Sequence, residues 1–169
     1  MKLHFVVGPF GEGQRDFSRL LKKKLTKEGH QCRSGSCGSL VCLDNYGGVV
    51  ALDLNFCLSE IEQNIKKHKN IDHLILNGVG LALYLKEILD LHFDANVYLV
   101  RKDFNKLEND QKFIETLMLL TEDITEEWIY TANKKINDVI EYFEKNTDQQ
   151  WNDVNEIDKT LRVLKYEPR

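Results

Sequence analysis

The first 25 residues constrain the fold most, because a short apolar run meets a glycine-rich loop and then a helical pattern. The run Leu3–Val7 is apolar apart from His4, which is typical of a buried strand. The loop behind it holds three glycines, at Gly8, Gly11 and Gly13. Apolar residues then recur at helical spacing, at Phe17, Leu20, Leu21 and Leu25. The pattern predicts a strand, a loop and a helix in direct succession.

The glycine loop has the character of an anion-binding site. Backbone N–H groups converge on an anion only where no Cβ obstructs them, and a helix N-terminus adds unpaired N–H groups and a positive dipole end. We therefore predict that Gly8, Gly11, Gly13 and the backbone of Gln14, Arg15 and Asp16 form an anion nest. The alternative is a simple strand-to-helix turn that merely uses glycines.

The same glycines have the Walker A spacing, G-x-x-x-x-G, but not the side chains that complete this motif. The motif continues with Lys and then Ser or Thr, whereas this chain has Gln14 and Arg15. Glutamine donates a hydrogen bond without a charge, and arginine brings a charge but cannot ligate Mg²⁺. The sequence thus predicts a phosphate cradle without its usual lysine and metal ligand.

Composition narrows the class of protein. At 169 residues, the chain has the size of one domain with a substantial core. Its 42% hydrophobic and 30% charged content is ordinary for a globular protein, and its net charge of −4 argues against non-specific nucleic-acid binding. No stretch approaches the roughly 20 apolar residues of a membrane span. The N-terminal apolar run is too short for a secretory signal, so we expect a cytoplasmic protein.

Four cysteines fall in one short segment, at Cys32, Cys37, Cys42 and Cys57. The first three have the spacing C-x4-C-x4-C, which is not that of a zinc ribbon or knuckle. We interpret them as small, semi-buried thiols in or beside strands. Metal binding and a redox pair remain the alternatives, and no metal ligand is assigned.

Apolar strands alternate with amphipathic helices along the chain, which is the pattern of a parallel sheet covered on both faces. Strands are expected at 3–7, 31–33, 39–43, 48–54, 71–76, 95–100 and 128–131. Helices are expected behind the glycine loop and at 58–70, 81–92, 104–120 and 136–143. The prediction is a three-layer α/β domain with a mostly parallel sheet of about five strands, in which the first strand is central.

The expected domain spans residues 1–145, with a loop-rich insertion at 31–48 that is dominated by Ser, Gly and Cys. Residues 146–169 are expected to form a C-terminal helical extension packed on the domain. Its apolar stripe must be buried within the monomer, in a homodimer seam or on a protein partner. The stripe comprises Val154, Ile157, Leu161 and Leu164.

With this order of elements, residues 1–145 resemble the P-loop kinase superfamily, in particular the small nucleoside and nucleotide monophosphate kinases. The segment from Val6 through the first helix is similar to their phosphate loop, except at Gln14 and Arg15. The segment His73–Gly78 resembles their strand that ends in Asp-Gly and helps to hold the Mg²⁺ shell, with Asn77 in place of the acid. The segment 100–103, which leads into the expected helix 104–120, resembles their arginine-bearing lid, and Arg101, Lys102 and Lys106 are the basic candidates.

The resemblance implies that ATP or another nucleotide binds at the loop. Because three charged or metal-binding positions have changed, we expect a non-catalytic or repurposed relative that binds a nucleotide, a phosphorylated small molecule or a protein partner. One alternative is an active kinase in which Arg15 or Arg19 replaces the lysine, Asp53 holds a metal or accepts a proton, and Arg101 contacts the phosphates. Another is a structural protein that uses the surface of the fold.

Overall fold

A computed structural model of the chain describes residues 1–8, 13–37, 54–91, 93–102, 126–145 and 161–166. The chain alternates strands and helices, as the sequence predicts. In order, the elements are β1 (Lys2–Val7), α1 (Gln14–Lys27), β2 (Cys32–Ser36), α3 (Leu54–Lys67), β3 (His73–Asn77), α4 (Val79–Leu83), α5 (Leu85–Leu91), β4 (Asn96–Lys102), α7 (Glu126–Lys145) and β5 (Leu161–Tyr166).

The described strands form one five-stranded sheet in the order β2-β3-β1-β4-β5. Strand β1 pairs in parallel with β3 on one side and with β4 on the other, and β2 pairs in parallel with β3. Strand β5 runs antiparallel to β4. The α/β class, the mostly parallel sheet of about five strands and the central position of the first strand are confirmed.

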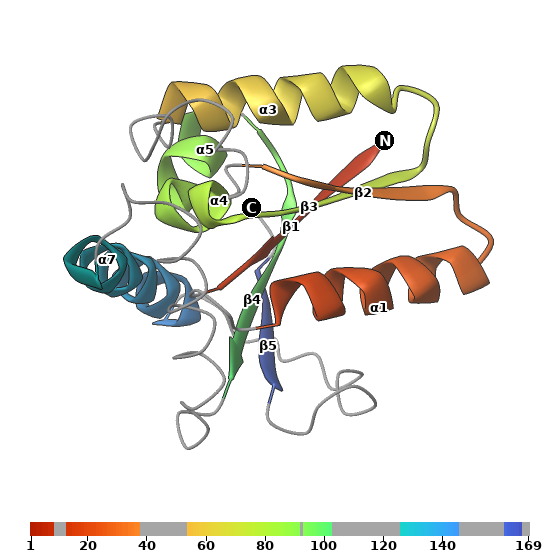
Figure 1. The fold of residues 1–169 in the computed structure, drawn as a ribbon. Coiled ribbons are helices and arrows are strands. Elements are labelled where there is room, and N and C mark those ends of the chain that lie inside the picture. Colours follow the sequence, from red (N-terminus) through yellow and green to blue (C-terminus); the bar gives the residue numbers. More distant parts are fainter. Residues whose placement is uncertain (9–12, 38–53, 92, 103–125, 146–160, 167–169) are drawn as a thin grey trace.

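The helices lie on both faces of the sheet and make three layers (Figure 1). Of the described helices, only α1 covers one face, whereas α3, α4, α5 and α7 cover the other. Because side chains alternate along a strand, Phe5 and Val7 enter the core of the second group, and Val6 enters the core under α1. The core under α1 is small and consists of Val6, Phe17, Leu21, Ile75, Tyr98 and Val100.

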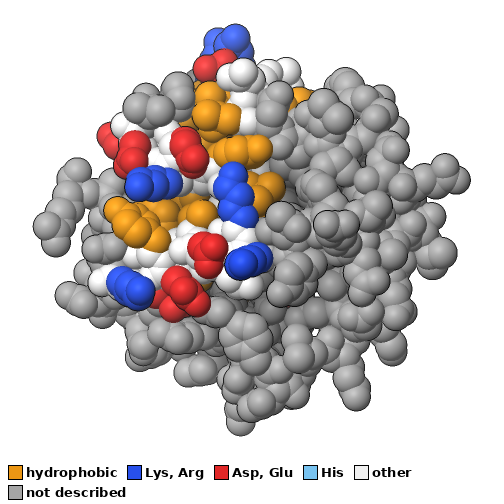
Figure 2. Space-filling view, turned by 90° about the vertical axis from the view of Figure 1, so that its left-hand side faces the viewer, with side chains coloured by type: hydrophobic (Ala, Val, Ile, Leu, Met, Phe, Trp, Pro, Cys, Tyr) orange, Lys and Arg blue, Asp and Glu red, His pale blue; other side chains and the backbone are white. Residues whose placement is uncertain are grey.

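The outer surface of the larger helical layer is mixed in charge. Figure 2 shows lysine or arginine and acidic side chains interspersed with apolar patches on this side of the molecule. Two lysines cover aromatic rings there: the Lys86 Nζ lies 5.0 Å from the ring centroid of Tyr142, and the Lys135 Nζ lies 4.6 Å from that of Tyr84. Such cation–π contacts shield part of the exposed rings from water.

Two predictions about the second half of the chain are wrong. Residues 128–131 were expected as a strand, but they lie within α7. The β-forming residues of Trp128–Thr131 are overridden by the helical pattern that continues through Ile136, Ile140 and Phe143, which are buried against the sheet. Leu161 and Leu164 were expected in a C-terminal helix, but they belong to β5, which completes the sheet beside β4.

The predicted helix 81–92 is present as two pieces, because α4 ends at Leu83 with Tyr84 as its C-cap, and α5 follows. The Tyr84 backbone, at φ −115° and ψ 19°, closes α4 by donating its N–H to the carbonyl of Gly80. The expected strand 39–43, the expected strand 48–54 except for Leu54, which begins α3, the helix 104–120 and the start of the C-terminal helix lie outside the described residues. In the described part of the chain, no helix has the length and apolar character needed to cross a membrane.

Candidate functional site

The carboxyl ends of β1 and β3 form the point of the sheet at which a ligand is expected. The chain leaves β1 towards α1 on one face and leaves β3 towards α4 on the other. In other open α/β sheets, a ligand binds outside the carboxyl ends of adjacent strands whose connections diverge in this way. The glycine loop of the sequence prediction begins at this edge.

Two glycines of the loop are required by their surroundings. A Cβ added to Gly8 would lie 2.2 Å from the carbonyl oxygen of Val100 and 2.6 Å from the Nε2 of Gln14, so only glycine lets β1 end this close to β4. Gly13 has φ 84° and ψ 18°, which is the left-handed region that favours glycine. It directly precedes α1, and no side chain caps this helix end. Gly11 lies outside the described residues.

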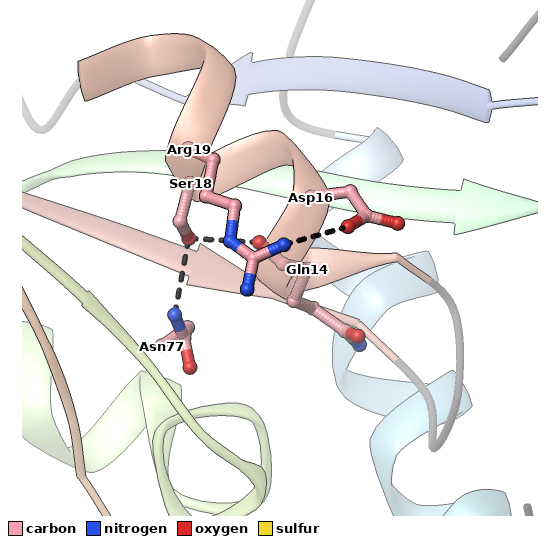
Figure 3. Close-up of polar contacts among 5 residues, drawn as sticks. All are labelled: Gln14, Asp16, Ser18, Arg19 and Asn77. Atoms are coloured by element: carbon pink, nitrogen blue, oxygen red, sulfur yellow. Dashed lines mark hydrogen bonds and ion pairs between the residues drawn. The ribbon is translucent and has the colours of Figure 1, made fainter. Parts of the chain in front are cut away.

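The three residues behind Gly13 differ in where their side chains lie. The amide of Gln14 is folded against Gly8, away from Ser18 and Asn77 in Figure 3. Arg15 is exposed. Asp16 is exposed as well, and its carboxylate lies 3.9 Å from the Arg19 guanidinium in a surface pair within the first turns of α1. Arg19 is exposed like Arg15, and the replacement of the missing lysine by one of them stays a prediction.

A hydrogen-bonded link joins α1 to the end of β3 (Figure 3). The Asn77 Nδ2 donates to the Ser18 Oγ at 3.1 Å, and the Ser18 hydroxyl donates to the carbonyl of Gln14 at 2.7 Å. Ser18 is buried. The sequence prediction named Asn77 as the substitute for a metal-holding acid but did not name Ser18. The sequence does indicate that Ser18 is buried, because this residue directly follows Phe17 in the buried stripe of the first helix.

The residue after Asn77 fixes the turn out of β3. Gly78 has φ 148°, and an added Cβ would lie 1.7 Å from the carbonyl oxygen of Cys37. The Cys37 N–H donates to the Asn77 carbonyl at 2.7 Å. The ends of β2 and β3 are therefore held tightly together beside the candidate site.

Of the other predicted site residues, Arg101 lies in β4 directly after the carbonyl that approaches Gly8. The register of β4 and β5 pairs Arg101 with Arg162. Arg162 was not predicted, because its position opposite Arg101 depends on a strand that the sequence pattern did not reveal. Asp53 lies outside the described residues.

A second polar cluster lies under α1, nearer the amino ends of the strands. The His4 Nδ1 lies 3.1 Å from the Tyr98 hydroxyl, and the His4 Nε2 lies 2.8 Å from the His73 Nδ1. The rings of His73 and His30 meet edge to face, 4.8 Å apart. His4 and Tyr98 are buried, His73 is half-buried and His30 is exposed. We call His30, His73, His4 and Tyr98 the histidine chain.

The cysteines are buried thiols where the structure describes them. Cys32, Cys37 and Cys57 are all buried, and none of them is in a disulfide. Cys32 lies in β2 and Cys37 directly follows it, as interpreted, whereas Cys57 lies in α3. Cys42 lies outside the described residues. Burial raises the pKa of the Cys32 thiol above its ordinary value. Within the described ranges, no group of three or more His, Cys, Asp or Glu residues is arranged to hold a metal ion.

Comparisons of the chain with protein-family models, with curated proteins and with solved structures gave no significant match.

Proposed function

We propose that the protein binds a phosphorylated ligand, such as a nucleotide, at the carboxyl edge of β1 and that it does so without Mg²⁺-dependent phosphoryl transfer. The observation that carries the proposal is the position of Gly13. This left-handed glycine begins α1 at the divergent point of the sheet and leaves the helix end without a side-chain cap. A helix N-terminus in this position offers N–H groups and a positive dipole end to a phosphate.

The side chains at this edge favour binding over transfer. Phosphoryl transfer depends on cations that neutralise the charge spread over the transferred group. The Gln14 amide, which packs against Gly8, is neutral. Asn77 is neutral too, and its Nδ2 is engaged with Ser18. An amide in the place of an acid is a weak Mg²⁺ ligand, so these residues can orient a phosphate but do not supply the charges of a kinase.

Two arginines beside the carboxyl end of β4 add support to the proposal. Arg101 and Arg162 occupy one cross-strand position, next to the carbonyl of Val100 that approaches Gly8. Arginine is well suited to phosphate because its planar fork donates two parallel hydrogen bonds. Replacing Arg101 or Arg162 by Gln is therefore expected to weaken phosphate binding, whereas Arg33→Gln on the distant edge strand β2 should not.

Calorimetry tests the proposal directly. The full chain is titrated with ATP, ADP and inorganic phosphate, each with and without Mg²⁺, and phosphoryl transfer is assayed with nucleosides and nucleoside monophosphates. We expect weak binding that Mg²⁺ changes little, and no turnover. Absence of binding to all three ligands would overturn the proposal. Mg²⁺-dependent turnover would instead favour an active kinase that uses Arg15 or Arg19, Asp53 and Arg101.

Restoring the Walker A side chains tests whether the backbone of the loop can still hold a phosphate. The double change Gln14→Lys with Arg15→Ser restores the Walker A consensus without changing the net charge. If the backbone cradle is intact, ATP affinity should rise at least about tenfold, which is roughly 1.4 kcal/mol. Gln63→Lys, at an exposed position on α3, is the control for an added lysine and should give no gain. If both variants bind ATP no better than the original chain, the glycines serve only a turn.

A further inference from the structure

The outer face of α1 carries a concentration of positive charge that neither the proposed phosphate site nor the histidine chain explains. Of the residues of α1, six are lysine or arginine and only Asp16 is acidic, so the helix has a formal charge of +5. Because the whole chain has a net charge of −4, the residues outside α1 together carry −9. The net charge argues against binding to nucleic acid only where charge is spread evenly, and here it hides one strongly basic helix.

Four of these cations follow one row along the helix. Arg15, Arg19, Lys23 and Lys27 recur at every fourth position, and all four are exposed. On an α-helix this spacing places successive side chains on the same side, about 6 Å apart along the axis, so the row extends over about 18 Å. We call these four residues the α1 ridge.

The fold itself does not need the α1 ridge. The helix is held on the sheet by its opposite, apolar side, and like charges four positions apart destabilise a helix. Lys27, in the last turn, complements the helix dipole, but Arg15, in the first turn, lies at the positive end of the dipole. Among the described residues, the only ion pair of the ridge joins Arg19 to Asp16, at 3.9 Å. The ridge therefore presents a row of cations to an external anion.

Further cations lie beside the ridge. Lys22 and Lys24 are half-buried on its two flanks. On the sheet, Tyr98 belongs to the core under α1, and the register of β4 and β5 pairs it with Lys165. Directly opposite residues share a face of the sheet, so Lys165 holds a position on the α1 side. The outer surface of the other helical layer is mixed in charge instead (Figure 2).

The chemistry of this face favours the phosphate backbone of a nucleic acid duplex. Lysine and arginine are the residues that neutralise such phosphates, and the step along the ridge is comparable to the distance between successive phosphates of one strand. Among the described residues, the exposed large apolar side chains are Met1 and Tyr142, and neither belongs to α1. The helix thus offers no ring on which unpaired bases could stack and no large apolar side chain that could enter a lipid surface.

We infer that the α1 ridge docks on the phosphate backbone of duplex nucleic acid without reading its sequence. A duplex groove is bordered by two rows of phosphates, which suits a helix with cations on its outer row and on both flanks. The affinity should then depend on salt and not on the base sequence. The inference does not rest on the proposed phosphate site, because the ridge runs along the outer face of α1 and the glycine loop lies at one end of the helix.

Fluorescence anisotropy of a labelled duplex measures this binding. The full chain is titrated into two DNA duplexes of unrelated sequence, each of about 20 base pairs or roughly two helical turns, at salt concentrations from about 50 to about 200 mM. We expect equal affinities for the two sequences. The logarithm of the binding constant should fall linearly with the logarithm of the salt concentration, with a slope of about −3 to −4 for four phosphate contacts. Absence of binding at the lowest salt would overturn the inference.

A matched pair of double variants tests whether the ridge makes the contact. Lys23→Gln with Lys27→Gln removes two cations of the ridge, whereas Lys66→Gln with Lys67→Gln removes two exposed lysines from the end of α3, in the other layer. The net charge changes equally in both. At about 50 mM salt, the ridge variant should lose at least about tenfold in duplex affinity, and the α3 variant less than about twofold. Equal losses would overturn the inference, because total charge and not the ridge would then set the affinity.

Other polyanions test the choice of a duplex. Single-stranded DNA, vesicles of phosphatidylcholine with phosphatidylserine, and polyglutamate are titrated at the same salt concentration. Each should bind more weakly than the duplex. If one of them bound more tightly and lost this affinity in the ridge variant, it would overturn the duplex and assign the ridge to a single strand, a membrane surface or an acidic protein segment.

Calorimetry with inorganic phosphate keeps this inference apart from the proposed phosphate site. Lys23 and Lys27 lie in the second half of α1, away from the glycine loop, so the ridge variant should bind phosphate like the original chain. A loss of phosphate affinity in this variant would overturn the inference, because the effect of the substitutions would not be confined to the ridge. If the original chain binds the duplex but not phosphate, the proposed site fails and the inference stands.

Discussion

The face of the sheet under α1 and the face under α3, α4, α5 and α7 are built from alternate residues of the same strands, yet their chemistry differs. The larger face is apolar, with Phe5, Leu74, Leu76, Val97 and Leu99 among its buried residues. The two buried polar side chains of the described residues, His4 and Ser18, both lie on the α1 face.

This difference assigns separate roles to the two layers. Burial of apolar surface holds the four helices of the larger layer, and such burial is insensitive to pH. The attachment of α1 combines a small apolar core with a directional hydrogen bond between Asn77 and Ser18. Hydrogen bonds between buried groups specify geometry and respond to protonation or to a ligand. Helix α1 also begins at the glycine loop, so the responsive layer is the one that bears the candidate site.

Two equivalent leucine truncations test the difference between the two layers. Leu76→Ala in the larger core should destabilise the protein by about 4 kcal/mol, and Leu21→Ala under α1 by about 2.5 kcal/mol. Both leucines are buried, but the smaller core lies under a single helix that can move to close the cavity. Urea unfolding measures both values. Equal losses would mean that the two layers contribute alike.

A pair of glycine substitutions tests the tight edge beside the site. Gly78→Ala should cost about 2–3 kcal/mol, because it combines an unfavourable φ with a clash against the Cys37 carbonyl. Gly29→Ala is the control: its φ of 91° is equally unfavourable, but nothing lies within 4 Å of the added Cβ. Strain alone should cost about 1 kcal/mol there. Thermal denaturation of the two variants would refute the packing argument if their losses were the same.

The link between α1 and β3 should have a smaller effect. Ser18→Ala removes the acceptor of the Asn77 Nδ2 and should cost about 1–2 kcal/mol, because a half-buried donor loses its partner. A double-mutant cycle with Asn77→Ala should give a coupling energy of about 0.5–1.5 kcal/mol. Additive losses in denaturant unfolding would show that the two side chains act independently.

The smallest effect is expected at the surface of α1. Arg19→Ala removes the pair with Asp16, whose atoms lie 3.9 Å apart on side chains that are 73% and 61% exposed. Water and salt screen such a pair, so the change in unfolding free energy should stay below about 0.5 kcal/mol. A loss above about 1 kcal/mol would show that Arg19 has a structural partner besides Asp16.

Local patterns in the sequence were enough to predict the framework of the fold. An apolar run interrupted only by His4 placed β1 before the glycines, and helical spacing placed α1. The runs at 71–76 and 95–100 located β3 and β4 to within a few residues. These patterns are local, because period 2 and period 3.6 record which face of an element is buried. The central position of β1 followed from the strand–loop–helix order.

The remaining features depend on contacts between distant parts of the chain. The apolar positions of Leu161 and Leu164 fit a helical stripe equally well, and pairing with β4 made them a strand instead. Likewise Trp128–Thr131 became helical in α7. The side-chain hydrogen bonds between strands, and between α1 and β3, join residues far apart in the sequence. The separation is 94 positions for His4 and Tyr98, 69 for His4 and His73, and 59 for Ser18 and Asn77. A one-dimensional pattern records burial and local spacing, whereas hydrogen bonds between distant side chains exist only once the strands are in register.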